Sequence, residues 1–255
     1  MKIALIQTSL FWEDVERNRI LFDKKITAIE QQVDLIILPE MFTSGFTMNP
    51  SKIAETMEGE TVVWLKSVAK RRDCAITGSL VICENGNYFN RLLFVFPTGE
   101  LEIYDKRHLF TLAGEDKEYT SGKLKSIVNF NGFKICPLIC YDLRFPVFSR
   151  NVEGYDLLLY VANWPEIRIN SWDALLKARA IENQCFVIGV NRIGHDNNNH
   201  LYNGHSQVID CMGNYLLEPQ EKEGVFIIDL KKDDLHSTRK KLDFLSDQDP
   251  FTLLE

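Results

Sequence analysis

Short runs of apolar residues recur along the whole chain, and several of them are apolar at every position rather than at alternate positions. Such runs are typical of strands that are covered on both faces by other layers of structure. We therefore expect a molecule whose strands lie inside it and whose helices lie outside. The runs occupy residues 3–7, 35–38, 75–81, 92–96, 133–139, 157–161, 186–190, 206–209 and 225–228.

Helical patterns separate these runs. Residues 15–31, 61–71 and 171–183 carry apolar side chains at the spacing of one helix face. Two turn sequences, Asn85-Gly86 and Pro97-Thr98-Gly99, are typical of β-hairpins, which a purely parallel sheet would lack. No glycine-rich phosphate-binding loop follows the first run. The pattern favours an α/β fold with mixed sheets over a Rossmann fold.

Composition excludes several classes of protein. The 255 residues are 45% hydrophobic, which suits a packed core and not a disordered or fibrous chain. The formal net charge is -7, so neither nucleic acid nor an anionic membrane is an expected partner. No apolar stretch approaches the roughly 18 residues that span a bilayer. Without repeats or linkers, the sequence predicts one domain over residues 1–255, with residues 231–255 as a tail or a dimer-contact extension.

The six cysteines indicate reduced thiols. The first apolar run is too short for the core of a signal peptide, so a cytoplasmic protein is expected. Cys136 and Cys140 lie in a strand-like segment, about 13 Å apart along one face, which disfavours a disulfide or a shared metal. His195, His200 and His205 match no zinc-ligand spacing and are assigned to a solvated loop. No metal site is predicted.

An ionisable residue stands beside a buried run at three places. The first is Glu40, which follows Leu35 to Leu38 and Pro39 and precedes two more apolar residues. A carboxylate in such surroundings has a raised pKa and is suited to act as a general base. The alternative is a glutamate solvated at the end of a strand, and the rarity of fully buried acids favours that alternative from the residues alone.

The second place is the cluster Asp105-Lys106-Arg107-His108, which has apolar and aromatic residues on both sides. Lysine and arginine are normally exposed, so a solvated loop is the simpler interpretation. The functional interpretation turns the Lys106 ammonium inward, as a fixed positive charge for a developing oxyanion.

The third place is Cys140, at the end of an apolar run, where residues 141–151 are compatible with the start of a helix. A cysteine on such a turn is raised above the sheet edge, and helix N–H groups favour its thiolate. Cysteine is also among the most buried residue types, so a core position is the alternative, and it is the one assigned to Cys136. No histidine suits a Cys–His pair, so the base of a Cys140 nucleophile would be a carboxylate.

Taken together, Pro39-Glu40, residues 104–110 and residues 139–146 resemble the three signature segments of the nitrilase superfamily of carbon–nitrogen hydrolases. Their order and spacing also resemble those of the family. Further segments, residues 41–46, 162–165 and 177–183, resemble its omega-amidase branch, which acts on 2-oxo acid amides. The resemblance implies a four-layer α-β-β-α sandwich, a homodimer and no cofactor.

The same resemblance implies a catalytic triad of Glu40, Lys106 and Cys140. Glu40 would accept the thiol proton while Cys140 attacks the carboxamide carbon. The Lys106 ammonium and the main-chain N–H of Tyr141 would hold the negative oxygen. Glu40 would then protonate the departing ammonia and activate the water that cleaves the thioester.

Many relatives carry a second glutamate seven residues before a glycine, and this offset from Gly122 falls on Glu115. Glu118 is the rival, because the intervening loop aligns in more than one way. Glu115 is preferred here. The alternative is that it is one more acid in an exposed, charged segment.

Fewer features of the sequence indicate which substrate is bound. The carboxylate of a 2-oxo dicarboxylic acid monoamide, such as 2-oxoglutaramate or 2-oxosuccinamate, needs a cation, ideally a guanidinium. Arg168 is assigned to that contact, whereas Arg144 is interpreted as a structural partner of Asp142. Phe42 and Trp164 are proposed as apolar walls, although aromatic residues more often belong to the core.

Other functions share these features. A nitrilase, or an amidase for another small amide, would use the same triad with a different pocket. A non-catalytic or redox-sensing thiol protein on the same fold is the alternative from another class, and it would oxidise reversibly at Cys140 without turning over amides.

Overall fold

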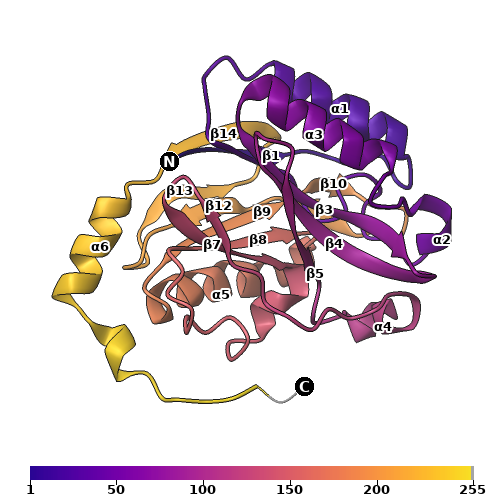
Figure 1. Ribbon diagram of the computed structural model, residues 1–255. Coiled ribbons are helices and arrows are strands. Elements are labelled where there is room, and N and C mark those ends of the chain that lie inside the picture. Colours follow the sequence, from indigo (N-terminus) through magenta and orange to yellow (C-terminus); the bar gives the residue numbers. More distant parts are fainter. Residues whose placement is uncertain (254–255) are drawn as a thin grey trace.

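The first of two mixed sheets contains the beginning and the end of the chain. The computed structural model describes residues 1–253, and in it six strands pair in the order β14-β1-β2-β3-β4-β5 (Figure 1). Strands β1, β2 and β3 are parallel, and the remaining pairs are antiparallel. The strands are β1 (Lys2–Gln7), β2 (Leu35–Ile37), β3 (Ala75–Glu84), β4 (Asn87–Val95), β5 (Leu101–Asp105) and β14 (Gly224–Asp229).

The second sheet has the order β13-β12-β9-β8-β7-β6. Its central strands β7, β8 and β9 are parallel, so their carboxyl ends lie at one edge of the sheet. A separate hairpin, β10 (Ile193–His195) with β11 (Leu201–Asn203), follows β9. The sheet strands are β6 (Val128–Phe130), β7 (Phe133–Ile139), β8 (Leu157–Ala162), β9 (Phe186–Asn191), β12 (Ser206–Ile209) and β13 (Tyr215–Gln220).

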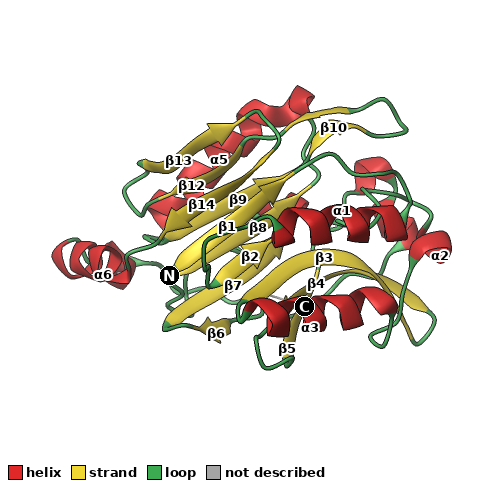
Figure 2. Cartoon of the chain, turned by 90° about the horizontal axis from the view of Figure 1, so that it is seen from above, coloured by secondary structure: helices red, strands yellow, loops and turns green. Residues whose placement is uncertain are grey.

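Helices cover the outer faces of the two sheets (Figure 2). Helices α1 (Val15–Thr27) and α3 (Glu60–Arg72) cover the first sheet, and α5 (Ile169–Glu182) covers the second. This arrangement confirms the expected α-β-β-α sandwich with mixed sheets. Both predicted hairpins are present, between β3 and β4 and between β4 and β5. None of the helices within residues 1–253 is long and apolar enough to cross a membrane.

One predicted helix is wrong. Residues 141–151 do not form an α-helix, and the chain after β7 instead makes a short 3-10 helix, Cys140–Arg144. Pro146 explains the early end, because a residue before proline is disfavoured in the α conformation. Phe145 accordingly has ψ of 84°. Cys136 lies in the core, as expected. The other short helices are α2 (Pro50–Ile53), α4 (Glu115–Glu118), and the 3-10 helices Thr111–Ala113, Glu166–Arg168 and Phe244–Asp247.

The C-terminal segment includes a docked helix, α6 (Lys232–Lys241). Its Leu235 is fully buried, and its Lys232 and Arg239 form ion pairs with Asp156 at 2.8 and 3.3 Å. The first part of the predicted tail is therefore attached to the domain. Beyond α6 the chain runs away from the helix along the side of the molecule (Figure 1).

Candidate active site

The carboxyl ends of four strands, two from each sheet, bring the site residues together where the two sheets meet. Glu40 follows β2 and Lys106 follows β5, and both strands belong to the first sheet. Cys140 follows β7 and Asn163 follows β8 in the second sheet. Such carboxyl ends are where ligands commonly bind in sheets of this kind.

Lys106 lies between two buried carboxylates. Its Nζ is 2.9 Å from Oε1 of Glu40 and 2.9 Å from Oε2 of Glu115, and none of the three side chains is more than 1% exposed. Burial opposes the charged ammonium, but Glu115 and Glu40 together raise the pKa of Lys106 above its ordinary value. Lys106 is therefore a fixed cation at neutral pH, and the solvated-loop interpretation is wrong for this residue.

Glu40 is held in place from both sheets. Its Oε1 accepts a hydrogen bond from Nδ2 of Asn90 at 2.8 Å, and its Oε2 accepts one from the main-chain N–H of Asn163 at 2.7 Å. The side-chain amide of Asn163 also donates to the main-chain oxygen of Glu40 at 2.6 Å. The next residue, Met41, has φ of +42°, a strained value for a side chain of that kind. Glu40 is thus buried and oriented, unlike a glutamate solvated at a strand end.

Glu115 begins α4 and points inward, whereas Glu118 in the same helix is exposed. The Glu115 carboxylate accepts a hydrogen bond from the N–H of Phe110 at 2.6 Å as well as the bonds from Lys106. Burial raises the pKa of Glu115, although Lys106 opposes that shift. The structure brings Glu115 to the lysine and leaves Glu118 away from it.

Gly122 explains how the glutamate segment fits against the lysine strand. A Cβ atom at Gly122 would lie 2.1 Å from the main-chain oxygen of Asp105, so a side chain there would collide with backbone. The N–H of Gly122 donates to the main-chain oxygen of Lys106 at 2.9 Å. The glycine therefore allows two chain segments to pair closely beside Lys106.

Cys140 stands at a sharp turn. Its φ is +43°, and its Sγ lies 3.9 Å from the main-chain oxygen of Asn163. Burial and the nearby Glu40 raise the pKa of the Cys140 thiol well above its ordinary value, although Lys106 opposes the shift. The expectation of a thiolate stabilised by helix N–H groups is wrong, because the following helix has only five residues and two carboxylates lie close by. The raised pKa favours a neutral thiol as the resting group.

Asp142 connects the cysteine turn to the lysine turn. Its fully buried carboxylate accepts hydrogen bonds from the hydroxyl of Tyr104 at 2.7 Å and from the N–H groups of Ile139 and His108 at 3.0 Å each. Nδ1 of His108 also lies 2.7 Å from it. The predicted pairing of Asp142 with Arg144 is therefore wrong, because other groups surround this carboxylate.

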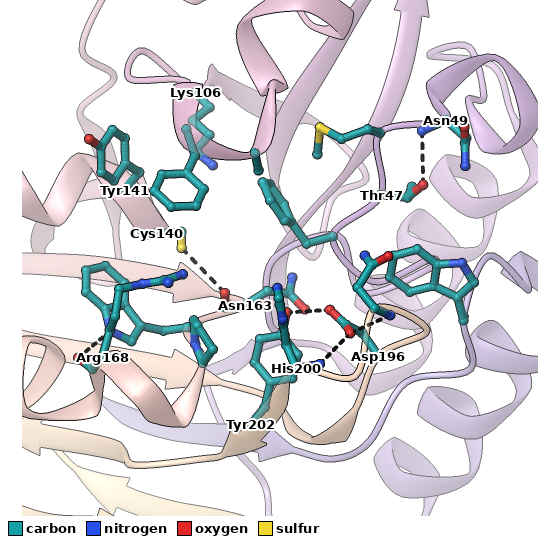
Figure 3. A pocket seen from close by; sticks show the side chains of 18 of the residues that line it. Thr47, Asn49, Lys106, Cys140, Tyr141, Asn163, Arg168, Asp196, His200 and Tyr202 are labelled. Atoms are coloured by element: carbon teal, nitrogen blue, oxygen red, sulfur yellow. Dashed lines mark hydrogen bonds between the residues drawn. The ribbon is translucent and has the colours of Figure 1, made fainter.

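A cavity of about 400 Å³ opens in front of Cys140 (Figure 3). Of the residues predicted to contact substrate, Tyr141, Trp164 and Arg168 line it. Arg144 lines it as well, with its guanidinium 4.9 Å from the ring centre of Trp164, while that of Arg168 is 5.1 Å from the ring centre of Phe110. Within residues 1–253, no carboxylate lies within 4.0 Å of either guanidinium.

Phe42 is not a wall of this cavity. It is fully buried between the first sheet and its helices, with its ring centre 5.4 Å from that of Phe22 and 6.1 Å from that of Trp64. The positive φ of Met41 turns the chain so that Phe42 enters the core. Phe46, four residues later, lines the cavity instead. The chain turns again before Phe46 at Gly45, where φ is +74°. The glycine at this position is the feature of the sequence that could have indicated the turn.

The hairpin of β10 and β11 forms the remaining wall. Asp196, His200 and Tyr202 line the cavity, and the Tyr202 hydroxyl donates to Oδ2 of Asp196 at 2.9 Å (Figure 3). The predicted solvated loop holds for His195 and His200 in that both are exposed, but His200 also faces the cavity. His205 departs from the prediction, since its Nδ1 lies 2.8 Å from Asp173.

Comparisons with known proteins agree with this geometry. The carbon–nitrogen hydrolase family model matches residues 2–240. The chain is 43% identical to omega-amidase YafV of Yersinia enterocolitica over 100% of this chain and 99% of the relative. It is 31% identical to 2-oxoglutaramate amidase of Bacillus subtilis, over 92% and 91%. A solved structure of a CN-hydrolase superfamily protein, XC1258 of Xanthomonas campestris, has a TM-score of 0.97 and 43% identity over 100% and 99% of the two chains. That structure carries an arsenic adduct in its active site.

The fold and the matched residues define the class of protein as a carbon–nitrogen hydrolase of the nitrilase superfamily. Within that family, the chain belongs to the omega-amidase branch, by its identity to these relatives over almost its whole length.

Proposed function

We propose that this protein is a cysteine-dependent amidase that hydrolyses the terminal carboxamide of a small 2-oxo acid amide, 2-oxoglutaramate or 2-oxosuccinamate, to the acid and ammonia. The observation that carries the proposal is the position of Cys140 in the wall of a cavity that also contains the Lys106 ammonium and two guanidinium groups without described carboxylate partners. The names of the omega-amidase and 2-oxoglutaramate amidase relatives support the choice of substrate.

In the first half of the reaction, Glu40 accepts the thiol proton as Cys140 attacks the carboxamide carbon. Since the resting thiol is neutral, proton removal accompanies the attack. The oxygen that becomes negative is stabilised by Lys106 and by the main-chain N–H of Tyr141. Collapse of this intermediate breaks the carbon–nitrogen bond, Glu40 protonates the leaving nitrogen, and ammonia departs from a thioester on Cys140.

In the second half, water enters the place that ammonia has left. Glu40 accepts a proton from that water while the water oxygen attacks the thioester carbon. The proton then passes from Glu40 to the Cys140 sulfur as the thioester breaks. The free acid is the product, and no cofactor takes part. Glu115, whose Oε2 lies 2.9 Å from Nζ of Lys106, contributes by holding that ammonium beside Glu40 through both steps.

The substrate carboxylate is placed against the guanidinium of Arg168, and the neighbouring Arg144 adds a second positive charge to the same side of the cavity. Trp164 supplies an apolar wall that holds the Arg144 guanidinium at 4.9 Å. Such a pair of cations favours an amide with a carboxylate over an uncharged amide.

The wider setting is also proposed. The chain would act as one domain in the cytoplasm, as a homodimer formed by pairing of the sandwiches. Residues 242–253, with Phe244 60% exposed and Phe251 40% exposed, are available for that contact. Sedimentation of the purified protein tests the dimer, since a monomer at micromolar concentration would remove this part of the proposal.

A panel of amides tests the substrate assignment. Ammonia release from 2-oxoglutaramate and 2-oxosuccinamate is expected to exceed release from glutamine, pentanamide and a simple nitrile by at least about 100-fold in kcat/KM. Preference for an uncharged amide or for a nitrile would replace the proposed substrate class. Reversible oxidation of Cys140 without turnover of any amide would indicate a thiol sensor instead.

A further inference from the structure

Arg192, the residue after β9, is a buried cation that the proposed reaction does not use. Its side chain is 0% exposed, although arginine is among the residue types that are least often buried. Within residues 1–253, no carboxylate lies within 4.0 Å of its guanidinium. Burying a charge without such a partner is unfavourable for the folded state, so a position of this kind calls for a reason other than stability.

The contacts of Arg192 join the two walls of the cavity. On one side, its Nε and Nη2 donate to the main-chain oxygens of Ile193 and His195, at 3.2 and 3.0 Å, which are the first and last residues of β10. The guanidinium lies 4.7 Å from the ring centre of Tyr202, which lines the cavity.

On the other side, Nη1 of Arg192 reaches the loop that follows Glu40. A Cβ atom at Gly45 would lie 3.1 Å from this Nη1 and 3.4 Å from the ring of Trp12, another cavity residue. The same Nη1 has no hydrogen-bond partner among the described residues. The absence of a side chain at Gly45 therefore makes room for the guanidinium.

Tyr202 connects Arg192 with the acid of the hairpin. Its hydroxyl donates to Asp196, whose carboxylate also accepts hydrogen bonds from the N–H groups of Asn198 and His200, at 2.8 and 2.9 Å. Asp196 is thus occupied by groups of its own hairpin. Burial lowers the pKa of Arg192 while Tyr202 and Asp196 act in the opposite direction, and arginine stays protonated at neutral pH.

We propose that Arg192 is a positioning residue that makes the cavity selective for an anionic amide, by fixing the β10–β11 wall around Tyr202 and by placing behind it a positive charge that has no carboxylate of the described residues within 4.0 Å. A charge in such a poorly solvated place acts over a longer distance than one at the surface. The inference rests on the proposed function, because it concerns the selectivity of that same cavity.

The test compares Arg192→Met with the wild type on 2-oxoglutaramate, on glutaramate, which lacks the 2-oxo group, and on pentanamide, which lacks the carboxylate as well. We expect the ratio of kcat/KM for 2-oxoglutaramate to that for pentanamide to fall at least about tenfold, through KM and with kcat within about threefold. Arg192→Lys keeps the charge and should recover most of the ratio.

Arg239→Met is the matched control, because Arg239 is also largely buried but anchors α6 far along the chain from the cavity residues. It should lower the melting temperature and leave the ratio unchanged. Equal losses on all three amides in Arg192→Met, or a change of melting temperature alone, would overturn the inference. If the wild type prefers glutaramate, the proposed substrate is wrong, and the inference is then judged by the ratio of glutaramate to pentanamide.

Discussion

The main-chain N–H of Asn163 donates a hydrogen bond of 2.7 Å to Oε2 of Glu40, although 123 residues separate them and they follow strands of different sheets. The side-chain amide of Asn163 also donates a hydrogen bond to the main-chain oxygen of Glu40. Glu40, the proposed general base, is therefore fixed to the sheet that carries Cys140, the proposed nucleophile. The reacting groups keep their relative positions only while the two sheets stay packed together.

Replacement of the second glutamate tests its role beside the lysine. Glu115→Gln removes one of the two negative charges that hold the Lys106 ammonium, so kcat should fall about 100-fold or more while KM changes less than about threefold. Steady-state ammonia release measures both constants. Glu118→Gln is the matched control in the same helix, and its exposed side chain predicts wild-type rates. Loss of activity in Glu118→Gln with an active Glu115→Gln would reverse the assignment.

The rate of alkylation reports the protonation state of the Cys140 thiol. Because burial and Glu40 raise the pKa of the Cys140 thiol, the thiolate fraction at pH 7 is small and increases with pH. The rate of labelling by iodoacetamide should rise about tenfold per pH unit between pH 7 and 9, with no plateau. Mass spectrometry of a Cys83→Ser variant removes the other partly exposed thiol from the signal. A plateau near pH 7 would mean that the resting group is a thiolate.

The carboxylate contact is tested by Arg168→Ala. The variant should raise KM for 2-oxoglutaramate at least about tenfold and leave KM for pentanamide within about threefold, since a guanidinium contributes only to binding of the charged substrate. Initial rates over a range of each amide give these values. Equal increases for both amides would show that Arg168 shapes the cavity without contacting the carboxylate.

The C-terminal helix gives the stability of the fold a dependence on pH. Burial would raise the pKa of Asp156, but the N–H of Lys134 and the Lys232 side chain more than offset this, and the pKa is lowered. A lowered folded pKa means that the stabilisation is present above the pKa of the unfolded chain, near pH 4, and is lost as pH falls through the folded value. Asp156→Asn should cost about 2 kcal/mol at pH 7.

Urea denaturation at pH 7, 5 and 3 measures this difference in unfolding free energy between wild type and Asp156→Asn. The difference should be similar at pH 7 and 5 and smaller at pH 3. At pH 3 the Asp156 carboxyl group of the unfolded wild-type chain takes up a proton before that of the folded protein does, which lowers the unfolding free energy of the wild type. A difference that stays constant to pH 3 would show that the Asp156 charge does not hold α6.

Much of the fold follows from local pattern. The strands at Phe133–Ile139 and Ser206–Ile209 have the predicted bounds, although Lys134 interrupts the first apolar run and two polar residues begin the second. Motif resemblance, rather than pattern, was needed to select Glu40 and Lys106, since a buried acid and a buried lysine contradict the usual preference of these residues for water. Their burial becomes favourable only once each has the other as partner.

The wrong predictions have physical causes that are not visible in the amino-acid sequence. Phe42 and Phe46 look alike in sequence, and the positive φ of Met41 and of Gly45 decides which of them enters the core. Arg144 was assigned to Asp142 because they are close in sequence, yet the Asp142 carboxylate is already bonded to Tyr104, a residue of β5 in the other sheet. Arg192 carried no signal at all, because its role depends on contacts with two separate loops.

The most direct test of the central claim is a single-turnover experiment with 2-oxoglutaramate on the wild type and on Cys140→Ala, stopped by acid and followed by intact mass and ammonia release. We expect an acyl adduct on the wild type that maps to Cys140 and one ammonia released for each adduct formed. Neither signal should appear in Cys140→Ala, which should keep the wild-type melting temperature within a few degrees. Ammonia release by a folded Cys140→Ala protein, or an adduct on another residue, would contradict the assignment of Cys140 as the nucleophile.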